Sequence, residues 1–165
     1  MKRKILISLI LSILLITGCG NSTNDNKNEG QVQDKLEAKV ENLTISLDST
    51  GSFNDISYKY PSKATTGNVG LYNIMDYMND KELVFRVVMY YFENKSLDDA
   101  MTITSNKTKT INGIEWHIYD DKTEDGKDLT TYAYYNNKGT YSIGFIHDKD
   151  INNFIDVFMN TVKFK

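Results

Sequence analysis

The sequence predicts an α+β fold in which a mainly antiparallel sheet is flanked by a short helix and a C-terminal amphipathic helix. Segments rich in β-branched and aromatic residues recur along residues 43–146, and several alternate apolar with polar positions, which is typical of strands. Turn sequences such as Asn112-Gly113 separate neighbouring segments and indicate hairpins. The final segment repeats its apolar residues at helical spacing. Strands joined by hairpins and covered by helices define the α+β class.

The first strands are expected after residue 42. Apolar and polar residues alternate over 43–47 and again over 56–60, so both segments are predicted to be strands. Pro61 ends the second strand. Small and polar residues predict a turn at 49–52 and a loop over 62–68.

The middle of the chain contains the most buried strand that the sequence predicts. Residues 69–77 fit a strand or a helix, and we favour a strand because no N-cap residue precedes them. Residues 83–92 are β-branched and aromatic on both faces apart from Arg86, so this segment is predicted to be a central strand covered on both sides.

A short helix and two hairpins follow. Ser96 is a predicted N-cap, and Asp98 and Asp99 in the first turn suit the positive end of the helix dipole. The hairpins are predicted from the pairs of apolar segments on either side of two turns: 108–111 with 114–119, and 129–135 with 141–146.

The C-terminal segment has the clearest helical pattern. Its apolar residues are spaced at i, i+3, i+4, i+7 and i+11: Ile151, Phe154, Ile155, Phe158 and Val162. This spacing predicts an amphipathic helix whose apolar stripe covers the core, followed by a short terminal strand.

Residues 1–18 have the pattern of a signal peptide. Three basic residues precede an apolar run over 5–16. About twelve residues span about 18 Å as a helix, which is short of the ~30 Å hydrocarbon core of a bilayer. A signal sequence therefore fits this segment better than a transmembrane helix.

The end of this segment, Ile16-Thr17-Gly18-Cys19, resembles the bacterial lipobox. The resemblance implies a diacylglycerol thioether on Cys19, cleavage before Cys19, and retention at the extracytoplasmic face of the cell membrane. The membrane is then the expected partner of lipidated Cys19, since two or more acyl chains anchor a protein stably. Cys19 is the only cysteine, so no disulfide is expected in the folded region.

Residues 19–42 are predicted to carry the lipid and form a flexible polar tether, and residues 43–165 to form one domain. Val32, Leu36 and Val40 recur at helical spacing, so a short helix over 31–41 is an alternative for part of the tether.

The charge of the chain excludes an ordinary nucleic-acid binder. The sequence has 19 basic and 22 acidic residues, and removal of Lys2, Arg3 and Lys4 with the signal peptide leaves 16 basic residues against the same 22 acidic ones. Nucleic-acid binders usually present a basic face. An acidic domain is not drawn to anionic lipid headgroups either, so the lipid must hold it at the membrane.

Several short motifs resemble those of the PsbP-like family: Ile56-Ser-Tyr-Lys-Tyr-Pro61, Asn94-Lys-Ser-Leu-Asp-Asp-Ala100, Ile111-Asn-Gly-Ile-Glu115, Thr140-Tyr-Ser-Ile143, and the segment from Phe154 to Phe164. The resemblance covers residues about 43–165. Ser62 follows the proline where family members often have Gly-Trp. The family implies a sheet flanked by helices, usually without catalytic activity, and includes photosystem accessory subunits and many bacterial lipoproteins. It has no shared catalytic residues to transfer.

The densest acidic cluster is 120–128. Its carboxylates are hard oxygen ligands that suit Ca²⁺. An EF-hand alignment from Asp121 places Tyr132 where the loop requires Glu, so a solvated hairpin loop is the favoured interpretation and no metal site is predicted. His117 and His147 are the only histidines, and we interpret both as surface residues because a zinc site needs more ligands. No cofactor is predicted.

Three residues are the candidates for ligand binding: Arg86, Tyr132 and Tyr134. Arg86 has the geometry to grip a carboxylate or phosphate, although an arginine in a strand is more often paired with Asp or Glu. The two tyrosines are candidates for an aromatic surface that also includes Tyr135, Tyr90 and Tyr91; the alternative is packing between strands.

These observations predict a membrane-tethered extracytoplasmic lipoprotein, not an enzyme, that acts as a binding or accessory module for a protein or small molecule. One alternative is a metal-dependent enzyme that uses the acidic cluster with His117 or His147. Another is a solute-binding component of a transporter, although such receptors usually have two lobes and residues 43–165 are short for that.

Overall fold

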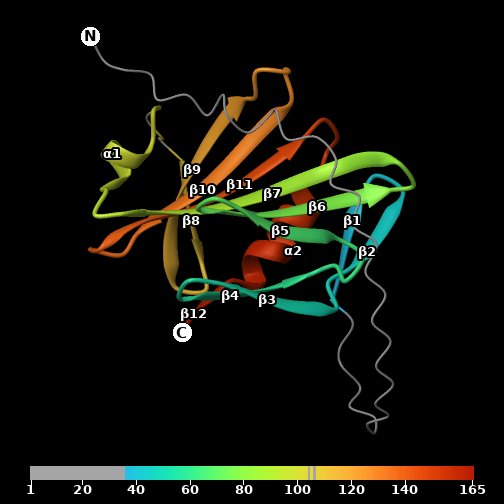
Figure 1. The fold of residues 1–165 in the computed structure, drawn as a ribbon, viewed down its shortest axis with the longest axis horizontal. Helices are drawn as coiled ribbons and strands as arrows, with labels where there is room; N and C mark the ends of the chain where they lie inside the picture. Colours follow the sequence, from blue (N-terminus) through green and yellow to red (C-terminus); the bar gives the residue numbers. More distant parts are fainter. Residues whose placement is uncertain (1–35, 104, 106) are drawn as a thin grey trace, which may run out of the picture. The chain divides into compact units, whose positions relative to one another are not determined.

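The computed structural model describes residues 36–103, 105 and 107–165 (Figure 1). The predicted signal peptide, Cys19 and most of the predicted tether lie outside the described residues. Over the part that is described, no helix has the length and apolar character needed to cross a membrane.

The described residues form a sheet-rich α+β fold whose strands pair in the antiparallel sense. The strands are β1 (Glu37–Val40), β2 (Leu43–Ser46), β3 (Ser49–Phe53), β4 (Ile56–Tyr60), β5 (Thr65–Val69), β6 (Tyr72–Asn79), β7 (Glu82–Glu93), β8 (Lys107–Ile111), β9 (Ile114–Lys122), β10 (Asp128–Tyr135), β11 (Gly139–His147) and β12 (Lys163–Phe164). The helices are α1 (Leu97–Ala100) and α2 (Asn152–Thr161).

A large sheet has the strand order β5-β6-β7-β11-β10-β9-β8. β7 lies inside this sheet, where Arg86 pairs with Asp76 of β6 on one side and with Ile146 of β11 on the other. The predicted position of 83–92 inside the sheet is therefore confirmed. The expected cover on both faces is not, because Arg86, Tyr90 and Phe92 on one face are only half-buried. Two smaller sheets have the orders β1-β2 and β12-β4-β3.

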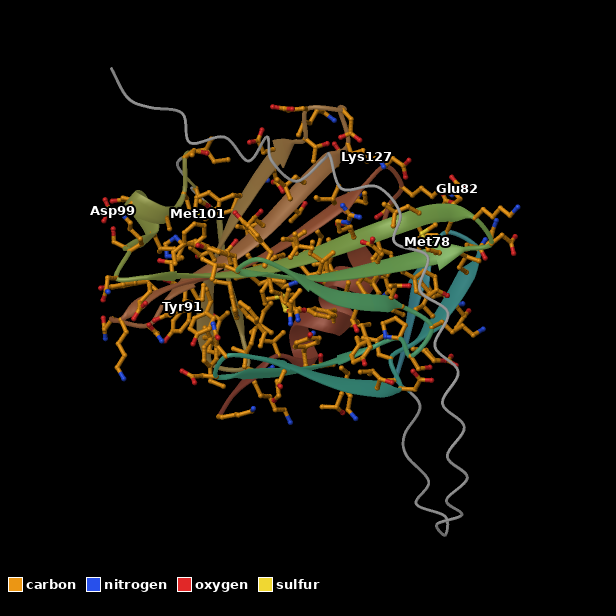
Figure 2. All side chains as sticks on the ribbon, viewed as in Figure 1. Met78, Glu82, Tyr91, Asp99, Met101 and Lys127 are labelled. Carbon is orange, nitrogen blue, oxygen red and sulfur yellow. The ribbon has the colours of Figure 1, made fainter. Side chains whose placement is uncertain are left out.

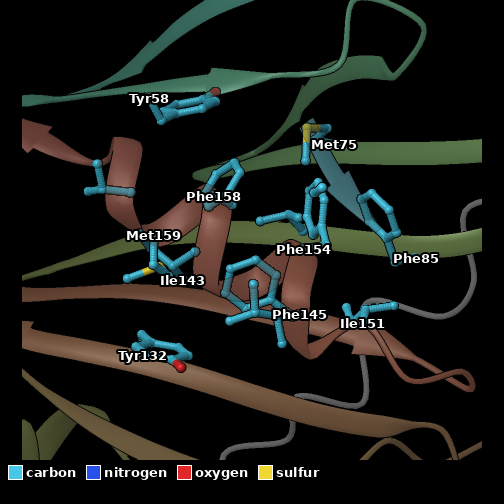
Figure 3. Close-up of a cluster of buried hydrophobic side chains, with 14 of the residues drawn as sticks. Tyr58, Met75, Phe85, Tyr132, Ile143, Phe145, Ile151, Phe154, Phe158 and Met159 are labelled. Carbon is cyan, nitrogen blue, oxygen red and sulfur yellow. The ribbon is translucent and has the colours of Figure 1, made fainter. Parts of the chain in front are cut away.

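The core gathers around α2, which lies between the large sheet and the strands β3 and β4 (Figure 1). The ring of Phe154 lies 4.1 Å from that of Phe85 in β7. Figure 3 shows Phe158 between Phe145 of β11 and Tyr58 of β4, with ring centroids 5.6 and 5.5 Å away. The predicted amphipathic helix is confirmed, because its apolar stripe is buried.

Polar contacts hold both ends of α2. The backbone N–H of Lys39 in β1 donates to Asn153 Oδ1 at 2.7 Å. At the other end, the side-chain amide of Asn112 donates to the carbonyls of Asn160 and Val162, each at 3.0 Å. Asn112 lies in the predicted Asn-Gly turn between β8 and β9, where its φ of 52° agrees with a type I′ hairpin.

The first strand, β1, corrects the prediction for residues 31–42. The expected helix over 31–41 is wrong for residues 37–40, which form a strand that pairs with β2. Ala38 and Val40 are buried, whereas the alternate residues Glu37 and Lys39 are exposed. The folded unit therefore includes β1 and begins before residue 43.

Two further strands replace a predicted turn and a predicted loop. β3 covers the expected turn at 49–52, because Gly51 makes room for an aromatic ring instead of reversing the chain. A Cβ added to Gly51 would lie 2.6 Å from the ring of Tyr58. β5 covers most of the expected loop over 62–68. All five of its residues are exposed at the edge of the sheet, so it has no buried face to give an apolar pattern.

The predicted N-cap of α1 is confirmed. The Asp99 N–H donates to Ser96 Oγ at 3.3 Å, and the φ and ψ of Ser96 are extended.

Candidate functional site

Arg86 lies on the face of the large sheet that points away from α2, since the alternate residues Phe85 and Val87 belong to the core. Its Nε and Nη2 atoms donate to the two carboxylate oxygens of Asp76, at 2.6 and 2.7 Å. This hydrogen bonding raises the pKa of Arg86. A parallel pair of hydrogen bonds is the strong form of this ion pair. The partner of Arg86 is therefore Asp76 on the neighbouring strand.

Tyr132 and Tyr134 lie on the opposite face, within or beside the core. Tyr132 is 5% exposed, and its ring packs edge-on against Phe145 at 6.1 Å. Tyr134 is half-buried between Trp116, 5.8 Å away, and Phe164, 5.4 Å away. The structure does not bring these tyrosines together with Arg86, and their rings pack against other side chains.

The two histidines do not converge. His117 pairs with Ala133 of β10 and His147 pairs with Asp128. These positions are five residues apart along β10, which corresponds to about 17 Å in a strand. Both histidines are half-buried. The Nδ1 atom of His147 lies 2.7 Å from the carbonyl oxygen of Lys149.

The acidic cluster 120–128 spans the end of β9, a hairpin loop and the start of β10. Its carboxylates pair with lysines and with the hydroxyls of Thr123 and Thr130 instead of with one another. Lys107 Nζ lies 2.5 Å from Asp120, and Lys122 Nζ lies 2.5 Å from Asp128. Within residues 36–103, 105 and 107–165, no group of three or more His, Cys, Asp or Glu side chains is placed to hold a metal ion.

A groove of about 410 Å³ lies at the C-terminal end of β7. Its volume is in the range of ordinary ligand-binding sites, ~300–1,000 Å³. Its lining combines aromatic and apolar side chains with three polar ones: Phe53, Asn54, Leu71, Tyr90, Tyr91, Phe92, Glu93 and Lys95. We refer to this feature as the β7 groove.

The β7 groove exists because β6 ends before β7 does. The last residue of β7 that pairs with β6 is Met89, opposite Asn73. The chain turns into β6 at Gly70, whose φ is +61°, a conformation that favours glycine. β7 continues to Glu93, and β11 remains paired with it to the end. Among the described strands, residues 90–93 thus have a partner on one side only.

Tyr91 forms part of the inner lining of the groove, and its ring packs closely against Gly139. A Cβ added to Gly139 would lie 2.5 Å from the carbonyl oxygen of Phe92 and 2.7 Å from the ring of Tyr91. The Tyr91 ring also packs 4.5 Å from that of Tyr141. Figure 2 shows Tyr91 on the side of β7 that faces β3 and β4.

The turn between β3 and β4 forms one wall, and hydrogen bonds fix its position. Asn54 has a φ of 49°. The next residue, Asp55, accepts hydrogen bonds from the Tyr141 hydroxyl at 3.2 Å and, through its carbonyl, from the Lys165 N–H at 2.8 Å. Burial, followed by the Asp55 contact, raises the pKa of Tyr141 to about 12. The hydroxyl therefore keeps its proton at neutral pH and remains a donor.

The turn between β5 and β6 forms the other wall. Its Leu71 side chain is 72% exposed, the largest value among the exposed large hydrophobic residues that the structure describes. Beside it, the Tyr90 ring packs 4.6 Å from Tyr72 and 4.3 Å from Phe92. Glu93 and Lys95, of opposite charge, are exposed at the end of the groove.

Sequence reasoning found part of this site. It named Tyr90 and Tyr91 as members of a possible aromatic surface, and both line the groove. It missed Phe53, Asn54 and Leu71. The available signals were two potential turn sequences, Asn54-Asp55 and Gly70-Leu71, next to aromatic residues.

No protein-family model matches the sequence, and no curated protein matches it. One similar solved structure is a crystal structure from Bacteroides thetaiotaomicron VPI-5482, with a TM-score of 0.47 and 11% sequence identity. The match covers 67% of this chain and 45% of that one, so this chain spans less than half of that protein.

Proposed function

We propose that this chain is a non-catalytic binding module, anchored through lipidated Cys19 at the extracytoplasmic face of the cell membrane. The support for the anchor is the order of basic residues, short apolar run and Ile16-Thr17-Gly18-Cys19 in the sequence. The support for binding is the β7 groove. In this proposal the lipid keeps the groove close to the membrane, and the groove binds its partner there.

The observation that carries the binding function is an open groove with a mainly apolar lining and one wall that hydrogen bonds hold in position. Exposed apolar side chains that gather in a recess are typical of interaction sites, whereas single exposed ones are common everywhere. Leu71 and the rings of Tyr90 and Phe92 supply the apolar contact area. The Tyr141–Asp55 hydrogen bond holds the wall formed by Asn54, so a partner need not order that wall on binding.

We also propose a PsbP-like architecture, with the sheet flanked by α1 and α2. The motifs that carry the resemblance fall on strands, helices and a hairpin turn of the fold. Residues 56–61 form β4 and the proline after it, residues 94–100 include α1, residues 111–115 span the β8–β9 turn, and residues 154–164 cover most of α2 and β12. The non-catalytic role is the one that this resemblance implies.

A photo-crosslinking amino acid placed at Leu71 tests the binding function in the full, membrane-attached chain. The matched control is Met78, which is 41% exposed and lies at the other end of the large sheet from Tyr91 (Figure 2). We expect a discrete crosslinked product from position 71 that position 78 does not give. Equal products from both positions, or none from position 71, would contradict a binding role for the groove.

A further inference from the structure

The backbone at the end of β7 has hydrogen-bonding groups that face the groove. The Asn94 N–H donates to the Lys138 carbonyl at 2.8 Å. Phe92, two residues earlier, pairs with Thr140, so its backbone groups have the same orientation toward β11. In an antiparallel ladder, alternate residues bond to opposite neighbours. Phe92 and Asn94 therefore bond to the β11 side, whereas Tyr91 and Glu93 direct their N–H and C=O groups to the β6 side.

No described strand takes up these groups. Pairing between β6 and β7 ends at Asn73 and Met89, and the register would place position 71 opposite Tyr91. Leu71 instead lies in the turn that leads into β6. Tyr91 and Glu93 thus offer two donors and two acceptors to the groove, repeating at about 6.6 Å along the strand.

This repeat favours a polypeptide over other ligands. An extended peptide carries donors and acceptors at the same spacing and binds open sheet edges as an added strand. A glycan or a lipid has no backbone that matches the spacing. The two formal charges of the lining, on Glu93 and Lys95, cancel, so the groove does not favour an anionic polymer.

The side chains of the lining suit alternate residues of such a strand. Tyr90 and Phe92 lie on one face of the sheet, and Tyr91 lies on the other face with Phe53 nearby. Successive side chains of an added strand would contact these two sets in turn. A second copy of this chain fits less well, because its own edge is recessed between the same two walls, at Asn54 and Leu71.

We propose that the β7 groove binds an extended, mainly apolar polypeptide segment of another protein, which pairs with Tyr91 and Glu93 as an added strand. This inference rests on the proposed binding function and names the class of partner.

The first test measures amide hydrogen exchange in the free protein by NMR. It uses the lipid-free mature chain, residues 19–165 with Cys19→Ala. The amides of Tyr91 and Glu93 should exchange about tenfold or more faster than those of Tyr90 and Phe92, because only the latter pair bonds to β11. Equal protection of all four amides would show that the edge is already closed and would overturn the proposal.

The second test uses random peptides of about seven residues, the scale of one short strand, selected against the same chain. Bound peptides are retested against Leu71→Arg, which places a charge in the groove wall, and against Met78→Arg, the matched control. Peptides that bind the groove should lose affinity about tenfold or more with Leu71→Arg only. Their binding should also protect the amides of Tyr91 and Glu93 from exchange.

N-methylation of each peptide residue in turn then tests strand pairing. Methylation removes one backbone donor, so affinity should fall about tenfold at every second residue and change little between them. Uniform tolerance to methylation would overturn strand addition and leave the groove as a binding site. Failure to select any Leu71-dependent peptide would overturn the polypeptide assignment. A crosslink from position 71 to a glycan or to a second copy would then identify another occupant and leave the binding function intact.

Discussion

Two glycines of the large sheet show how much a single methyl group can matter. Gly139 lies against the carbonyl of Phe92 and the ring of Tyr91, whereas a Cβ at Gly67 would meet no atom within 4 Å. Gly139→Ala should lower the free energy of unfolding by roughly 1–3 kcal/mol, as overpacking usually does. Gly67→Ala should change it by less than about 1 kcal/mol.

Denaturant unfolding of both variants checks this prediction. Similar effects of the two substitutions would mean that the close approach of β7 and β11 at Gly139 has no energetic importance. The Gly139 variant should also weaken crosslinking from position 71, since Tyr91 must move to admit the methyl group.

Tyr58 predicts how stability depends on alkaline pH. It is buried, its hydroxyl donates to Asn73 Oδ1 at 3.2 Å, and burial, followed by the nearby Tyr60, raises its pKa to about 12. The unfolded chain has a tyrosine pKa of about 10. The folded state thus holds the proton more tightly, and this stability is complete below about pH 10 and lost as the pH rises through about 12.

Tyr58→Phe should therefore lose less stability than wild type between about pH 9 and pH 12. Urea unfolding at several pH values measures the difference. Asn73→Ala is the control, since it removes the acceptor and leaves the phenol in place, so its pH dependence should persist. An unchanged pH dependence in Tyr58→Phe would contradict the buried, protonated state of this residue.

Among the elements, α2 should contribute strongly to stability, because four of its residues are buried. Phe158 is fully buried, and its ring contacts Tyr58, Phe145 and Phe154. Truncation of a buried phenylalanine costs roughly 3–5 kcal/mol, and small domains are stable by only about 5–15 kcal/mol. Phe158→Ala should therefore lower the melting temperature strongly, whereas Asn152→Ala, on the exposed side, should change it little.

Thermal unfolding of the lipid-free mature chain separates two views of this helix. If α2 were an exposed segment that docks on a partner, Phe158→Ala would leave the midpoint unchanged and weaken binding only. That result would contradict the core position of the helix.

The elements that could be predicted from the sequence are those with many apolar residues in a regular pattern, because such residues must be buried. β7 is apolar on both faces, and α2 repeats Phe154, Phe158 and their neighbours at helical spacing. β1 and β3 gave misleading local patterns, since Leu36 and Val40 fit a helix and Gly51 fits a turn. β5 has no buried face, and four of its five residues are Thr, Gly or Asn. β5 is a strand because it pairs with β6, and local sequence patterns do not encode that pairing.

The candidate site was less predictable because it depends on register. The aromatic character of Tyr90 and Tyr91 is visible in the sequence, but their availability depends on where β6 ends. Likewise, the sequence suggested that Arg86 pairs with an acidic residue, but only the alignment of β6 with β7 identifies Asp76. Strand register is set by contacts across the whole sheet.

At the scale of the whole molecule, the main prediction concerns attachment to the membrane. Cys19→Ala should release the protein from the membrane or leave it unprocessed, since one residue carries the proposed lipid. Metabolic labelling with a fatty acid, followed by membrane fractionation, measures both effects. Label that persists on the Cys19→Ala protein would contradict the lipobox interpretation. Phe158→Ala, which alters the fold but not the anchor, should still take up label.

The unequal lengths of β6 and β7 make the groove adjustable without any change to the core. The open length of the groove equals the length of β7 that extends beyond its pairing with β6. The β5–β6 hairpin alone determines where β6 begins. Insertions of a few residues on each arm of the hairpin would extend the ladder past Tyr91 and then Glu93, and deletions would uncover more of β7. Because loops and hairpin tips tolerate such changes, related chains can acquire grooves for longer or shorter segments, or close the site entirely, while α2 and the inner face of the sheet stay the same.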